Sequence, residues 1–154
     1  MSDHYDLFLA VNLPPDLPEP VLSELRWLLG QADMPAELKS ASWEGSLHEP
    51  WPTFDGGSAS LIFDGADVSL LVHDVDRPDQ PWALTVRTCV HEDDFEVTMD
   101  IVGWLLRHAT TRGWVGFVRD NGLGQVHHVV RHEDGFDLVE VCPASQPSFS
   151  WSSH

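Results

Sequence analysis

The chain has 154 residues and carries 25 Asp and Glu against eight Lys and Arg, which gives a formal net charge of −17 at pH 7. A surface of that sign repels DNA, RNA and anionic lipid and attracts basic proteins, so we expect a basic protein partner and neither a nucleic-acid nor a membrane partner. This length suits one domain, and 42% hydrophobic residues are enough for a packed core. No apolar stretch is long enough to cross a bilayer, and the first residues lack a secretory signal pattern, so we expect a cytoplasmic protein.

The first third of the chain predicts a strand, a helix and a long loop. Alternate apolar residues over 5–13 are typical of a half-buried strand. Asp16 is expected to cap a helix that buries one apolar face and ends near Gly30. Residues 31–57 hold several prolines and aromatic rings but no regular period, so we expect a long loop there, and such loops tend to be functional or disordered.

The rest of the chain predicts two three-stranded meanders separated by a helix. Asp64-Gly65 indicates a hairpin between strands at 60–63 and 68–72, and a third strand follows at 82–90. Acidic residues open the helix at 92–94, and it is expected to end near 112–113. The last three strands are expected at 114–119, 126–132 and 136–141, with a core face formed by Val115, Phe117, Val126, His128, Val130, Val139 and Val141.

These elements predict a single α+β domain over residues 1–142. The order β-α-βββ-α-βββ gives a mostly antiparallel sheet with two helices packed on one face. Residues 143–154 are rich in Ser and Pro and are expected to form a C-terminal tail.

The histidines and cysteines lack the spacing of metal ligands. His127 and His128 point to opposite faces of a strand, and His128 lies about 13 Å from His132 at about 3.3 Å per residue. Cys89 and Cys142 have no paired spacing. The chain also has no nucleophile elbow, zincin motif or phosphate-binding lysine motif. We therefore expect no metal, no cofactor, no catalytic residue and no enzymatic activity.

The loop at 31–57 mixes aromatic rings with carboxylates, which is the composition of a surface that recognises a basic protein. The alternative is that its rings fill the core beneath the loop. The candidate partner-binding residues come from this loop and from the acidic segment after the strand at 68–72: Trp43, Glu44, Glu49, Trp51, Phe54, Asp74 and Asp76.

The sequence YDLFLAV at 5–11 precedes an early proline-capped helix, and the sequence DIVGWLL at 100–106 precedes a glycine-turned meander. This layout resembles that of small α+β immunity proteins of bacterial polymorphic and contact-dependent toxin systems. The resemblance implies a cytoplasmic inhibitor that blocks a basic toxin by charge-complementary binding. It assigns no role to a particular residue.

Two other hypotheses stay open. One is a small-molecule-binding domain or enzyme with a pocket between the sheet and the long loop, where His48, Asp74 and Glu92 are the candidate polar groups. The other is that the acidity reflects genome composition or adaptation to high salt. A stability that rises steeply into molar potassium chloride would favour salt adaptation, whereas a basic partner requires no such rise.

Overall fold

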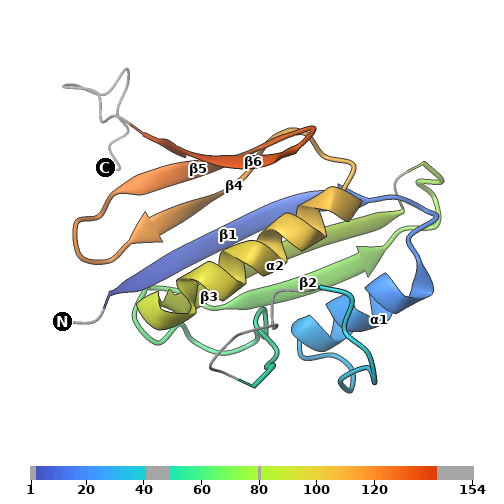
Figure 1. The fold of residues 1–154 in the computed structure, drawn as a ribbon, viewed down its shortest axis with the longest axis horizontal. Coiled ribbons are helices and arrows are strands. Elements are labelled where there is room, and N and C mark those ends of the chain that lie inside the picture. Colours follow the sequence, from blue (N-terminus) through green and yellow to red (C-terminus); the bar gives the residue numbers. More distant parts are fainter. Residues whose placement is uncertain (1–2, 41–48, 80, 142–154) are drawn as a thin grey trace, which may run out of the picture.

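The computed structural model describes residues 3–40, 49–79 and 81–141. In chain order the elements are β1 (His4–Leu13), α1 (Glu19–Leu28), β2 (Val68–His73), β3 (Trp82–His91), the 3-10 turn η2 (Glu92–Asp94), α2 (Phe95–His108), β4 (Gly113–Asp120), β5 (Val126–His132) and β6 (Gly135–Glu140). The strands form one antiparallel sheet in the order β2-β3-β1-β4-β5-β6. Both helices lie on the same face of this sheet (Figure 1). The α+β fold class is therefore confirmed.

Strand β1 lies inside the sheet, between β3 and β4, and its alternating sequence explains its position. Leu7, Leu9 and Leu13 are fully buried on the face that the helices cover. They pair with Thr88, Val86 and Trp82 of β3, so these residues of β3 lie on the same face.

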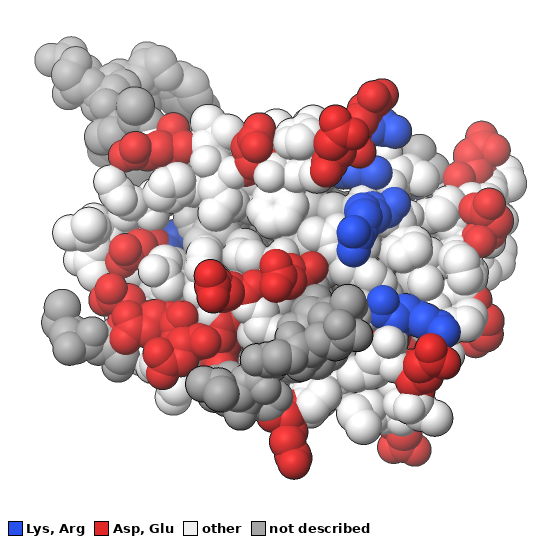
Figure 2. Space-filling model, viewed as in Figure 1, with Lys and Arg blue, Asp and Glu red and all other residues white. Residues whose placement is uncertain are grey.

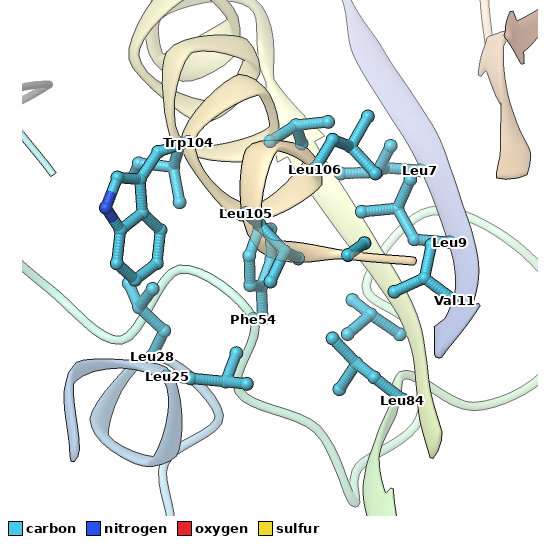
Figure 3. Packing of buried hydrophobic residues seen from close by; sticks show 14 of the residues in the cluster. Leu7, Leu9, Val11, Leu25, Leu28, Phe54, Leu84, Trp104, Leu105 and Leu106 are labelled. Carbon is cyan, nitrogen blue, oxygen red and sulfur yellow. The ribbon is translucent and has the colours of Figure 1, made fainter. Parts of the chain in front are cut away.

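The core fills the space between the sheet and the two helices (Figure 3). Leucines of α1 and the Trp104–Leu105–Leu106 segment of α2 meet side chains from β1 and β3 there. Phe54, from the long loop, lies between α1 and α2 and has no exposed surface. Its backbone N–H donates to the carbonyl of Leu28 at 2.8 Å, which fixes the loop on the end of α1.

The C-terminal end of α1 was predicted correctly, but its N-terminal cap was not. Gly30 has φ +76°, and the backbone N–H groups of Gly30 and Gln31 donate to the carbonyls of Trp27 and Arg26, so glycine ends this helix as predicted. The prediction that Asp16 caps the start is wrong. Pro18 takes the N-cap position with no side-chain hydrogen bond, and its carbonyl accepts from the N–H groups of the first turn.

Two other boundaries differ from expectation. The segment at 60–63 is not a strand, because Ser60 N–H donates to the carbonyl of Gly65 and closes a turn over these residues, leaving a single bridge between Ala59 and Ala66. Helix α2 ends at His108, several residues early. The chain leaves the helix there because Thr110 N–H donates to the carbonyl of Asn12 at the end of β1.

The core face predicted for the last three strands is wrong. Val118 and Gly116 pair with Leu7 and Leu9, so these residues, and not Phe117, point to the helices. The expected residues do share a face, but it is the opposite one: Phe117, Val126, His128, Val130, Val139 and Val141. Val115 is the exception, because the register shifts between Trp114 and Gly116 and Val115 is fully buried.

Candidate partner-binding surface

The residues predicted to bind a partner lie on separate segments. Trp43 and Glu44 fall outside the described residues. Trp51 is partly buried and packs against the core, whereas Glu49 is exposed. Phe54 is fully buried and belongs to the core, as the alternative interpretation of the aromatic loop has it.

Asp74 and Asp76 lie in the loop between β2 and β3, at one end of the sheet. The Asp74 carboxylate accepts from the N–H of Asp76 at 3.0 Å, and the Asp74 carbonyl accepts from the N–H of Arg77. This Asx turn gives the acidic loop a defined shape. Val75, between the two acids, is 77% exposed.

The face of the sheet opposite the helices, here called the open face, carries a large share of the exposed apolar side chains. Strand register assigns to it alternate residues of each strand. Six of them are large, apolar and at least one third exposed: Val68, Leu70, Val72, Trp114, Val139 and Val141. Two of these six, Val139 and Val141, were predicted to lie in the core, and this surface was not predicted.

Aromatic rings in the middle of the open face hold each other in place. The rings of Phe8 and Phe117 stack with centroids 5.4 Å apart, and Trp114 lies 6.3 Å from Phe8. The indole N–H of Trp114 donates to Nδ1 of His128 at 2.8 Å. His128 is therefore hydrogen-bonded on the open face and does not lie in the core, where it was predicted. Because the indole N–H has this internal partner, the exposed ring surface needs none from a ligand.

The one buried carboxylate on this face is neutralised by arginine. The Asp6 side chain is 4% exposed, and it accepts from Nε of Arg87 at 2.9 Å and from one terminal nitrogen of Arg119 at 3.0 Å. The hydrogen bond to Asp6 raises the pKa of Arg87 above its ordinary value. Segment 60–66 covers this end of the face, since Arg87 donates to the carbonyl of Ala66 and the Arg119 guanidinium lies 4.8 Å from the Phe63 ring centroid.

The open face is therefore close to neutral. Among the described strand residues that point to it, the only carboxylate besides Asp6 belongs to Asp137. Carboxylates instead occupy the loops and strand ends around it. At one end of the strands these are Asp3, Asp64, Asp67 and Glu92, and at the other end Asp74, Asp76, Asp79, Glu133 and Asp134.

The helix-covered side shows a different distribution of charge (Figure 2). Acidic side chains gather where α2 begins, at Glu92, Asp93, Asp94 and Glu96. Basic side chains lie mainly over the half of this side where α2 ends. A groove of about 470 Å³ beside α2 is lined there by residues of both signs, including Asp100, Arg107 and Asp134.

A metal site, a membrane-spanning helix or similarity to a known protein would each indicate a class of protein. Within the described ranges, no group of three or more His, Cys, Asp or Glu side chains is placed to hold a metal ion. No described helix is long and apolar enough to cross a membrane. No protein-family model, curated protein or solved structure matches the chain.

Proposed function

We propose that this protein is an acidic protein-binding domain, that its ligand is a basic protein, and that the open face is the binding surface. One observation carries the proposal: a nearly neutral, largely apolar sheet face that neither helix covers is bordered at both strand ends by carboxylates. An apolar centre surrounded by a polar rim is the usual composition of a protein interface.

The size of the open face indicates that a partner would also contact the carboxylates at both strand ends, here called the acidic rim. Six strands spaced about 4.8 Å apart make a face roughly 24 Å wide, and about five residues of each strand give a length of roughly 15 Å. The whole face is therefore roughly 360 Å² before the end under segment 60–66 is subtracted, and patches of a few hundred Å² are often functional in monomers. A stable interface buries about 800 Å² on each partner. A partner that docks on the open face therefore also meets the carboxylates around it.

A second copy of the chain is a poor occupant for this surface. Each copy carries a formal charge of −17, and docking face to face would bring two acidic rims together. Like charges placed opposite each other disfavour association, whereas a basic partner gains from the same rim in encounter rate and in orientation. Charge complementarity therefore selects a basic protein.

Within this class, we propose an intracellular inhibitor of the immunity type, which blocks a basic toxin domain by covering part of its surface. The layout resemblance to small α+β immunity proteins and the acidic rim support this proposal. A binding role needs no catalytic residue, and we propose none.

The experiment compares two variants that make the same chemical change at different places. Leu70→Asp alters the open face, where Leu70 is 53% exposed. Leu123→Asp alters the turn between β4 and β5, where Leu123 is 79% exposed. Both positions are exposed enough for the fold to tolerate a carboxylate. Wild type and both variants are immobilised, and host extract is passed over them at low and at high salt.

The proposal predicts that one basic protein is retained by wild type and by Leu123→Asp, and is lost from Leu70→Asp and at high salt. Surface plasmon resonance with that protein should show slower association for Asp74→Lys and Asp76→Lys. Coexpression should restore growth of cells that carry the partner if it is a toxin. The proposal fails if no basic protein is retained, or if Leu70→Asp binds it as tightly as wild type.

A further inference from the structure

A cavity of about 390 Å³ lies on the helix side of the sheet, near the start of α2. The strand register builds it, because Tyr5 pairs with Asp120 and Val118 pairs with His127, so side chains from neighbouring strands point to the same side. Its lining comes from β1, α2, β4, the β4–β5 turn, β5 and β6: Tyr5, Phe95, Val118, Asp120, Gln125, His127 and Leu138. Its volume falls in the range of small-molecule sites, about 300–1,000 Å³.

The body of this cavity is apolar and includes two aromatic rings. The rings of Tyr5 and Phe95 have centroids 4.4 Å apart and are tilted by 38°. Val118 and Leu138 add aliphatic surface from the sheet. An apolar chain of a few carbons is therefore a suitable occupant.

The polar groups of the cavity favour a positive charge. Asp120 is part of the lining, and its Oδ1 accepts from the backbone N–H groups of Gly122 and Leu123, which fixes the carboxylate at the mouth of the β4–β5 turn. Burial raises the pKa of Tyr5, and the carboxylates of Asp120, Asp3 and Glu92 raise it further. Those carboxylates create a negative potential at the Tyr5 hydroxyl, which attracts a cation and repels an anion.

We propose that this cavity binds an organic cation on a short apolar stem, a guanidinium or ammonium group carried by a chain of a few carbons. The stem contacts Tyr5, Phe95 and Leu138, and the charged head pairs with Asp120. The ring faces add a cation–π attraction. Free alkyl cations and the side chains of Arg or Lys share this chemistry. The site lies on the other side of the sheet from the open face, so it is independent of the proposed function.

Tyr5 is the only tyrosine in the chain, so the ultraviolet absorbance of its phenolate reports on this cavity alone. The ligand for the test is n-butylguanidinium, which stays charged while tyrosine titrates because guanidinium groups have pKa values above about 12. A cation beside the ring favours the phenolate, so saturating n-butylguanidinium should lower the pKa of Tyr5. Neutral n-butylurea, which has the same shape, should leave it unchanged.

Two variants and one peptide complete the test. Asp120→Asn should weaken binding roughly tenfold or more, because a charge-assisted hydrogen bond is lost, whereas Asp137→Asn on the open face should leave it unchanged. Leu138→Lys should lower the pKa of Tyr5 without added ligand and block the cavity. A blocked Gly-Arg-Gly peptide that binds tighter than n-butylguanidinium would indicate a protein side chain as the natural occupant, and weaker binding a free cation.

Two results would overturn the proposal. One is a Tyr5 pKa that does not respond to n-butylguanidinium or responds equally to n-butylurea. The other is that Asp120→Asn binds n-butylguanidinium as tightly as wild type does. An unchanged pKa of Tyr5 in a folded Leu138→Lys variant would lead to the same conclusion.

Discussion

Replacing Phe54 with alanine tests whether the long loop is held to the domain by its own core residue. Phe54 has no exposed surface and lies between the two helices. Removing the ring takes away its buried apolar surface and leaves a cavity, which costs about 3–5 kcal/mol for a buried phenylalanine. A natural domain has roughly 5–15 kcal/mol of stability, so Phe54→Ala should still fold. For this chain length the melting temperature should fall by roughly 6–20 °C.

Urea denaturation followed by far-ultraviolet circular dichroism measures the loss. Trp51→Ala is the matched control, because Trp51 comes from the same loop but is only partly buried. It should cost clearly less than Phe54→Ala. If Phe54→Ala loses less than about 1 kcal/mol, or no more than Trp51→Ala, the assignment of Phe54 to the core is wrong.

Three further predictions concern the backbone, the buried carboxylate and pH. Gly116→Ala should destabilise the domain by about 3 kcal/mol or more, because a Cβ there would lie 1.8 Å from the carbonyl oxygen of Phe8. Gly113→Ala is the control: Gly113 has φ +76°, but a Cβ there meets no atom within 4 Å, so this variant should cost about 1 kcal/mol in the same urea assay. Asp6→Asn should cost about 3–5 kcal/mol of stability, because it leaves Arg87 and Arg119 without their buried carboxylate. If the residues are coupled, the Asp6→Asn/Arg87→Gln double variant should lose less stability than the two single variants lose in sum. Burial, and to a lesser extent the charge of Arg107, lowers the pKa of His108 below its ordinary 6.5. As the pH falls, His108 therefore takes up a proton in the unfolded chain before it does so in the folded one. The free energy of unfolding should fall as the pH drops below about 6.5. His108→Asn should flatten that fall across a pH series of urea titrations, and an unchanged slope would contradict the reasoning.

Local sequence patterns predicted those elements in which only one face is apolar enough to be buried. The alternation of Leu7, Leu9 and Leu13 placed β1 and its buried face correctly, and the acidic residues at 92–94 marked the start of the second helix. The side of the sheet that β4–β6 bury was not predictable from alternation, because β5 has valines on both faces. Val129 is fully buried, while Val126 and Val130 lie on the open face. The register of β4 against β1 decides between the two, and that pairing joins residues more than 100 positions apart.

The candidate site shows the same limit. Composition predicted an acidic surface but not its arrangement around one face of the sheet, where Asp74 and Asp76 lie at one end of the strands. The open face was missed because the apolar residues that β4, β5 and β6 direct to it were assigned to the core. A signal did exist in the element count, since two helices on one side of a six-stranded sheet leave the other side uncovered. The buried role of Phe54 was not predictable either, because a lone aromatic residue in a loop is equally suited to a core and to an interface.

The most direct test of the open face is hydroxyl-radical footprinting of the free protein and of its complex with the basic partner. Trp114, 49% exposed on the open face, and Met34, 55% exposed in the segment after α1, are both reactive side chains. Our account predicts that complex formation protects Trp114 from oxidation and leaves Met34 as reactive as in the free protein. Protection of Met34 with no change at Trp114 would place the partner on the long-loop side and contradict it.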